Sequence, residues 1–108
     1  MRKEILNFVN TRCGSVSFAE LDKHIVDFRG KAGIGITEKN IWFWLRCSET
    51  AAATLEALIK EKTLKVTPTT PLVYFVDGAV PVLPVAKKMR QYKTARWLPV
   101  VLDIVKKR

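Results

Sequence analysis

The sequence predicts an α+β fold in which three helices precede a β-hairpin, with one further strand inserted between the second and third helices. Three segments before residue 63 carry apolar residues at the spacing of an amphipathic helix. Two short β-prone runs, 64–67 and 72–76, flank a turn that contains Pro68 and Pro71. The 108 residues suit one domain, and the 48% hydrophobic content is that of a globular chain.

Two helices are predicted at the N-terminal end of the chain. Residues 2–12 have an apolar face at 3.6-residue spacing, and Gly14 follows as a stop signal. Residues 17–28 begin with Ser17 as the N-cap and Glu20 three positions later, which is the capping-box pattern. Such a cap satisfies backbone N–H groups that the first turn of a helix leaves without partners, so it marks where the second helix starts.

The next segment, residues 29–40, is predicted to be a flexible connecting loop. Its glycines, Gly30, Gly33 and Gly35, lack the G-K-[ST] ending and the preceding strand of a phosphate-binding loop, so no nucleotide site is expected. Residues 41–45, IWFWL, are predicted to be a strand because they are β-prone and too short for a helix. Both faces of this strand are apolar, which leaves two interpretations: burial on both sides, or one face that binds a partner.

The third helix is predicted at residues 48–62, and the hairpin follows it. Ser48 is its N-cap, Glu49 lies in the first turn, and lysines lie in the last turn, which complements the helix dipole. In the hairpin, the prolines belong in the turn because they cannot donate to a strand ladder. The Asp-Gly pair at 77–78 is predicted to end the second strand.

The composition changes after residue 78. Residues 1–78 are therefore taken as the folded domain and residues 79–108 as a basic C-terminal extension, with helices considered at 85–97 and 99–106. Residues 79–108 hold eight basic residues and only Asp103 as an acid, whereas residues 1–78 hold 11 basic and nine acidic residues. Most of the net charge of +9 thus lies on the extension, and this asymmetry indicates an anionic partner.

No group of residues suggests catalysis or metal binding. Cys13 and Cys47 form no C-x-x-C motif, and the one histidine, His24, cannot complete a zinc site with them. Two buried thiols in a reducing compartment are expected, and a disulfide is left open. We therefore expect no enzyme, cofactor, metal or small-molecule substrate. No membrane span or signal peptide is apparent, so a cytoplasmic location is expected.

The order of elements resembles winged helix-turn-helix domains over residues 2–76. The segment SETAAATLEALIKEKTLKVTPTTPLVYFV is similar to the third helix and wing of that family, and the resemblance implies that the hairpin is a wing. One departure is that nineteen residues, 29–47, separate the second and third helices, where most such domains have a short turn. The inserted strand then either pairs with the wing or moves the helices too far apart for the usual DNA docking.

The resemblance implies a nucleic-acid partner, with DNA favoured over RNA and a homodimer left open. Small basic domains of this kind resemble regulators of prophages and plasmids, which implies transcription regulation. The exposed face of the third helix is poor for base recognition because Glu49 and Glu56 lie on it, so affinity is expected from the wing and the basic extension. The candidate nucleic-acid-binding residues are Thr50, Lys60, Lys65, Lys87, Lys88, Arg90, Tyr92, Lys93 and Arg96.

An alternative function is a non-catalytic protein-interaction or oligomerisation module. It would use the IWFWL segment and the exposed face of the 48–62 helix as contact surfaces. The dependence of affinity on salt concentration distinguishes the two functions. Five phosphate contacts give a slope of log affinity against log salt of roughly −4 to −5. Association through apolar surface lacks this dependence. For Tyr92 and Trp97, stacking on bases and packing against the domain both stay open.

Overall fold

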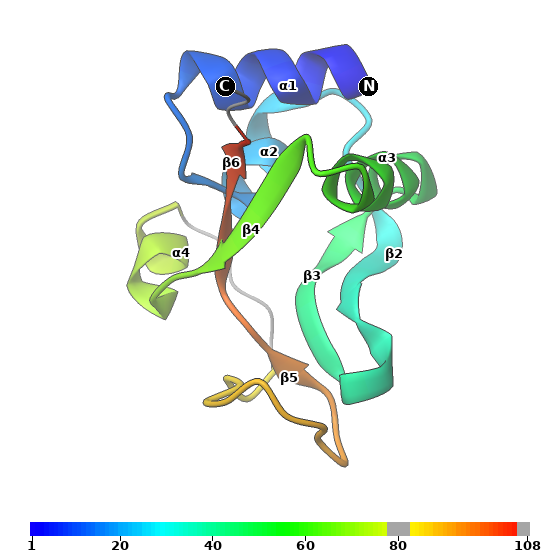
Figure 1. The fold of residues 1–108 in the computed structure, drawn as a ribbon, viewed down its shortest axis with the longest axis vertical. Helices are drawn as coiled ribbons and strands as arrows, with labels where there is room; N and C mark the ends of the chain where they lie inside the picture. The colour runs from blue at the N-terminus through cyan, green and yellow to red at the C-terminus, as the bar shows by residue number, and fades with distance from the viewer. Residues whose placement is uncertain (78–82, 106–108) are drawn as a thin grey trace.

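The computed structural model describes residues 1–77 and 83–105, which contain four α-helices, one 3-10 helix and six strands (Figure 1). The elements follow in the order α1 (Arg2–Thr11), β1 (Val16–Ser17), α2 (Phe18–His24), β2 (Arg29–Ile36), η1 (Thr37–Lys39), β3 (Ile41–Cys47), α3 (Glu49–Lys60), β4 (Leu64–Pro68), α4 (Pro71–Asp77), β5 (Arg96–Trp97) and β6 (Val100–Ile104).

The six strands form two three-stranded sheets. In the first sheet β6 lies between β1 and β4 and is antiparallel to both. In the second sheet β3 lies between β2, which is antiparallel to it, and β5, which is parallel. Figure 1 shows β4 and β6 below α1, while β5 and the far ends of β2 and β3 form the opposite end of the molecule.

One hydrophobic core serves both sheets. Its centre is a row of aromatic rings in which Phe18, Trp44, Tyr74 and Trp97 follow one another, with centroid distances of 6.3, 6.0 and 5.1 Å. These four residues come from α2, β3, α4 and β5, and none is more than 3% exposed. Offset and edge-to-face aromatic contacts add stabilisation beyond the area that they bury. The row therefore connects β3 and β5 of the second sheet with the helices α2 and α4.

The structure confirms several predicted elements. Helices α1 and α3 and strands β3 and β4 lie where the patterns placed them. At the start of α2 the Ser17 hydroxyl accepts a hydrogen bond from the Glu20 amide, and the Ser17 amide donates to the Glu20 carboxylate, so the capping box is present. The helix ends at His24, four residues earlier than predicted, because Ile25 has an extended backbone and Asp27 a positive φ of 63°.

The predicted hairpin is wrong, and the winged-helix-like fold class is wrong with it. Residues 71–77 form the helix α4, and the strand that pairs with β4 is β6. Pro71 is the first residue of α4, a position at which the missing N–H of proline is tolerated. The correct description is an α+β fold with four helices and two three-stranded sheets in the described residues.

The predicted loop at residues 29–40 is a strand followed by a 3-10 turn. Its glycines permit close backbone approach: a Cβ on Gly30 would lie 2.6 Å from the Ser48 Cα, and one on Gly35 would lie 2.7 Å from the Trp42 Cα. The inserted strand β3 pairs with β2 and β5, so the alternative in which this strand pairs with the predicted wing is wrong.

Residues 79–108 are not an appended extension in the part that the structure describes. Both predicted helices, 85–97 and 99–106, are wrong, because these residues supply β5, β6 and an irregular segment instead. Strand β6 is the central strand of the first sheet, and its Leu102 is fully buried. The predicted strand end at Gly78 and the cations of residues 106–108 lie outside the described residues.

The two cysteines are both free, and they differ in burial. Cys47 is fully buried and its thiol donates to the carbonyl oxygen of Ala32 at 3.4 Å. Burial raises the pKa of Cys47 to about 11. Cys13 is exposed, so the expectation of two buried thiols is correct only for Cys47.

Candidate nucleic-acid interface

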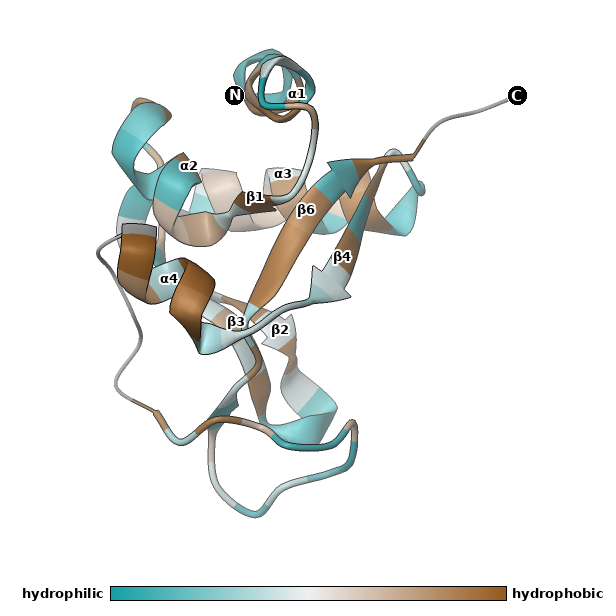
Figure 2. Cartoon of the chain, turned by 90° about the vertical axis from the view of Figure 1, so that its left-hand side faces the viewer, coloured by the Kyte–Doolittle hydropathy of each residue, from teal (hydrophilic) through white to brown (hydrophobic). Residues whose placement is uncertain are grey.

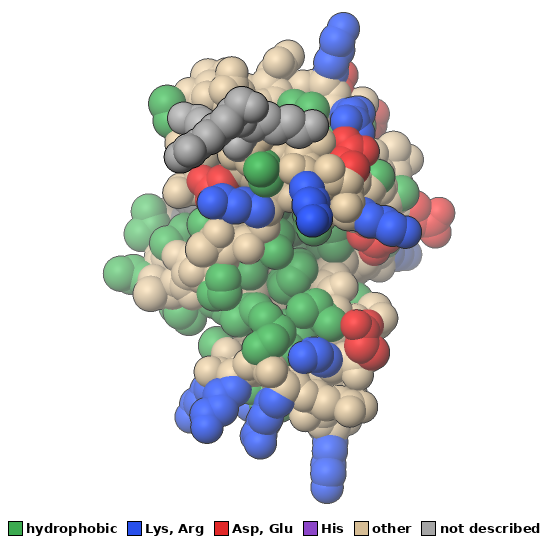
Figure 3. All heavy atoms as spheres, in the orientation of Figure 1, with side chains coloured by type: hydrophobic (Ala, Val, Ile, Leu, Met, Phe, Trp, Pro, Cys, Tyr) green, Lys and Arg blue, Asp and Glu red, His purple; other side chains and the backbone are tan. Residues whose placement is uncertain are grey.

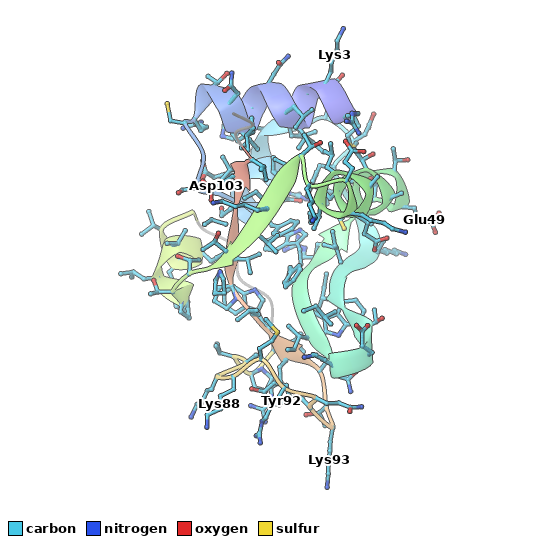
Figure 4. All side chains as sticks on the ribbon, viewed as in Figure 1. Lys3, Glu49, Lys88, Tyr92, Lys93 and Asp103 are labelled. Carbon is cyan, nitrogen blue, oxygen red and sulfur yellow. The ribbon has the colours of Figure 1, made fainter. Side chains whose placement is uncertain are left out.

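The basic loop, which we define as residues 87–96, carries five cations and no acidic residue. Four of these side chains are exposed and Arg96 is half-buried. Figure 3 shows Lys and Arg side chains projecting from the lower end of the molecule, with acidic atoms at its right-hand edge. Figure 4 places Lys88 and Lys93 at this end, with Tyr92 between them. The structure thus brings together six of the predicted site residues: Lys87, Lys88, Arg90, Tyr92, Lys93 and Arg96.

Tyr92 is the centre of the basic loop. Its side chain is only 7% exposed, and the guanidinium carbons of Arg90 and Arg96 each lie 5.0 Å from its ring centroid. A guanidinium at this distance is attracted by the electron-rich ring face. The ring therefore holds both guanidinium groups next to itself.

The Tyr92 hydroxyl binds the backbone at the start of the loop. It accepts hydrogen bonds from the amides of Lys87 and Lys88 at 3.0 Å each and donates to the Lys88 carbonyl oxygen at 3.0 Å. The pKa of Tyr92 is lowered, first by the backbone hydrogen bond from Lys88 and also by the Arg90 guanidinium. These bonds close residues 87–92 into a compact turn.

The loop is attached to the end of the β2–β3 pair. The Tyr92 amide donates to the Lys39 carbonyl oxygen at 3.0 Å, and the Asn40 side-chain amide donates to the Tyr92 carbonyl oxygen at 2.8 Å. The Arg96 amide donates to the Asn40 carbonyl oxygen at 2.8 Å. Asn40 has a left-handed backbone, with φ at 56°, which asparagine tolerates better than most residues. Asn40 was not among the predicted site residues, and no motif in the sequence marks it.

The cations of the basic loop are not neutralised within the protein. Among the side chains that the structure describes, in residues 1–76 and 83–105, no carboxylate oxygen lies within 4.0 Å of any of them. In the same ranges the Nε of Arg96 is buried and has no hydrogen-bond partner. By contrast, Arg29 pairs with Asp22 at 2.6 Å and Arg2 pairs with Glu61 elsewhere on the molecule. The positive charges of the loop are therefore available to bind an external anion.

Three predicted site residues lie away from the basic loop. Thr50 and Lys60 are exposed on α3, and Lys65 is on β4, where its register partner is Asp103. Figure 4 shows Asp103 and the α3 residue Glu49 in the opposite half of the molecule from Lys88 and Lys93. The nine predicted residues therefore do not form one surface.

The burial of the aromatic residues decides two pairs of alternatives that the sequence left open. Tyr92 and Trp97 are 7% and 3% exposed, so both rings pack in the protein and neither is free to stack on a base. In the IWFWL segment, Ile41, Phe43 and Trp44 are buried and the other two residues are half-buried. The strand is therefore core, and the partner-surface interpretation of it is wrong.

The structure shows an exposed apolar face that the sequence patterns missed. On α4, Leu72, Phe75 and Val76 are 66%, 63% and 78% exposed, while Tyr74 is fully buried. Figure 2 shows this helix as strongly hydrophobic on the outside of the molecule. The interpretation of these residues as a strand missed the face, because an exposed apolar face on one side of a helix is not expected of a strand.

Comparison of the chain with family models, with curated proteins and with solved structures found no match. Among the described residues, no helix has the length and apolar character to cross a membrane. No cluster of three or more His, Cys, Asp or Glu in the same ranges is placed to hold a metal ion.

Proposed function

We propose that this protein binds nucleic acid, with DNA favoured over RNA, and that the basic loop supplies the affinity. The observation that supports this proposal is the placement of five cations around Tyr92 without a carboxylate partner in the described residues. Lys and Arg that neutralise phosphates release condensed counterions, and this release drives most non-specific binding to DNA. A role as a regulator without catalytic activity is consistent with such binding and is part of the proposal.

The test is fluorescence anisotropy of a labelled mixed-sequence DNA duplex, titrated with the full-length protein at salt concentrations from about 50 to about 200 mM. Four or five phosphate contacts predict a slope of log affinity against log salt of about −3.6 to −4.5. A truncation at residue 78 is not a usable comparison, because it would remove β6 from the centre of the first sheet.

The deciding variant is the triple substitution Lys87→Gln, Lys88→Gln and Lys93→Gln. These side chains are exposed, and their loss leaves one or two phosphate contacts, so the slope should fall to about −0.9 to −1.8. The matched control removes three other exposed lysines by the substitutions Lys3→Gln, Lys23→Gln and Lys31→Gln. It changes the net charge equally and should keep the wild-type slope.

Two results would contradict the proposal. The first is the absence of binding even at about 50 mM salt, where phosphate contacts are strongest. The second is an equal loss of affinity in the loop variant and the control variant, which would mean that the protein binds only through its net charge. A third variant, Lys60→Gln with Lys65→Gln, measures what the α3 and β4 residues add.

A protein-interaction role is the second candidate, because α4 exposes three large apolar side chains. It replaces the version based on the IWFWL segment, which is buried. Sedimentation of the wild type and of Phe75→Ser at several concentrations tests it, since self-association through this face would be insensitive to salt and lost in the variant.

A further inference from the structure

The basic loop also indicates which form of nucleic acid it recognises. We infer that its partner is double-stranded DNA, contacted through the phosphates and without regard to base sequence. This inference rests on the proposed function and adds to it the class of ligand.

Single-stranded nucleic acid is usually held by aromatic side chains on which the bases stack. The basic loop has no such platform, because Tyr92 is covered by Arg90 and Arg96 and its hydroxyl is engaged by the backbone. Trp97 is buried in the aromatic row of the core. Phe75, the aromatic side chain that is 63% exposed, lies on α4 and not in the loop. What the loop offers to a ligand is therefore positive charge.

The loop is also held in one shape. Its middle is tied by the hydrogen bond between Tyr92 and Lys39, its C-terminal end is tied by the bond between Arg96 and Asn40, and β5 continues it into the second sheet. The Tyr92 hydroxyl fixes the amides of Lys87 and Lys88. Cations carried by a fixed backbone lose less conformational entropy on binding than cations on a mobile loop, and this advantage is largest when the ligand is equally rigid.

A duplex is the ligand that fits both properties. Its phosphates are fixed in space and carry one negative charge per about 1.7 Å of helix axis, so each contact releases more counterion than a contact with a single strand. Phosphate contacts position a protein on the duplex and carry no direct sequence information. Of the loop cations, Arg90 and Arg96 have a planar guanidinium that can bind a phosphate through two parallel hydrogen bonds.

The experiment measures the affinity of the full-length protein for four probes at one low salt concentration. The probes are two DNA duplexes of about 20 base pairs with unrelated sequences and one single strand from each duplex. We expect the two duplexes to bind within about twofold of each other and about tenfold more tightly than their single strands. A single strand that binds as tightly as its duplex, or a tenfold difference between the duplexes, would overturn the inference.

The variant Tyr92→Phe tests the reason for the preference, because it removes the hydroxyl and no charge. Without the hydroxyl the amides of Lys87 and Lys88 are released, so the ratio of duplex to single-strand affinity should fall about threefold or more. Circular dichroism confirms that the variant is folded. An unchanged ratio would show that fixed cation positions do not create the preference and would overturn the inference. A wild type that binds none of the four probes refutes the proposed function itself, so the two failures are distinguishable.

Discussion

The hydroxyl of Tyr74 joins three elements, and its removal tests the arrangement of the whole first sheet. It accepts a hydrogen bond from the Phe18 amide at 3.1 Å and donates to the Val100 carbonyl oxygen at 2.6 Å. Extending the register of β1 and β6 by one residue beyond Ser17 and Val101 would set Phe18 opposite Val100. The hydroxyl therefore bridges the two strands at the point where β1 gives way to α2.

Substitution of Tyr74 by phenylalanine keeps the ring contacts with Trp44 and Trp97 and removes the hydroxyl that forms this bridge. Phe18 and Val100 are 0% and 1% exposed, so water cannot easily replace the hydroxyl. A buried donor or acceptor left without a partner costs about 1–3 kcal/mol. We therefore expect the free energy of unfolding to fall by about 2 kcal/mol and the Tm by about 8–16 °C.

The assay is urea unfolding followed by tryptophan fluorescence, which reports on Trp44 and Trp97 in the core. The control is Leu72→Ala on the same helix, where a 66% exposed side chain predicts a change within about 0.5 kcal/mol. A Tyr74→Phe variant as stable as the wild type would refute the bridge and, with it, the docking of α4 against β6.

Three further predictions concern packing and the thiols. Gly35→Ala should lower the free energy of unfolding by about 3 kcal/mol, because the new Cβ would meet backbone atoms. Gly33→Ala should lower it by less, because its Cβ would meet the side chains of Trp42 and Leu45, which can move. Equal denaturation midpoints for the two variants would contradict this. In the folded protein a thiol reagent should modify Cys13 quickly and Cys47 only on unfolding, since Cys47 is fully buried; two fast thiols would contradict the structure. Burial raises the pKa of Cys47 from 9.0 to about 11. The neutral thiol therefore contributes about 2–3 kcal/mol to the free energy of unfolding below about pH 9, and this contribution is lost as the pH rises toward 11. The stability advantage of the wild type over Cys47→Ala should therefore shrink between about pH 8 and about pH 10.5, and a constant difference would show that the thiol is not desolvated.

The elements that were correctly predicted are those whose signals are local. The capping box of Ser17 and Glu20 and the N-cap at Ser48 define helix starts through atoms only three residues apart, and both caps are present. The β-prone composition of residues 64–67 likewise sufficed to predict β4.

The errors arise where long-range contacts decide. Residues 72–76 are β-prone by composition, yet the buried hydroxyl of Tyr74 finds its partners only when this segment is helical and packs against α2 and β6. Residues 29–36 have the glycines of a loop, but these glycines serve the close approach of β2 to β3. Their role depends on a neighbour that the local pattern does not reveal.

The candidate site was predicted only in part, because its charge is local in the sequence but its packing depends on long-range contacts. The run from Lys87 to Arg96 is visible as charge in the sequence, and the structure places its cations together at one end of the molecule. The roles of Tyr92 as the centre of the loop and of Asn40 as its anchor depend on a parallel pairing between β3 and β5, which are separated by nearly half of the chain. Composition cannot indicate such a pairing.

The central position of β6 has a consequence for the synthesis of the protein. Strands β1 and β4 each pair with β6 and not with each other, and β6 is the last strand of the described residues. A growing chain that has not yet reached residue 100 therefore contains β1 and β4, but neither strand can pair because β6 has not been made. Folding of this sheet must wait until residues 100–104 have been made, and an interrupted product would be left with unpaired strands that proteases can recognise.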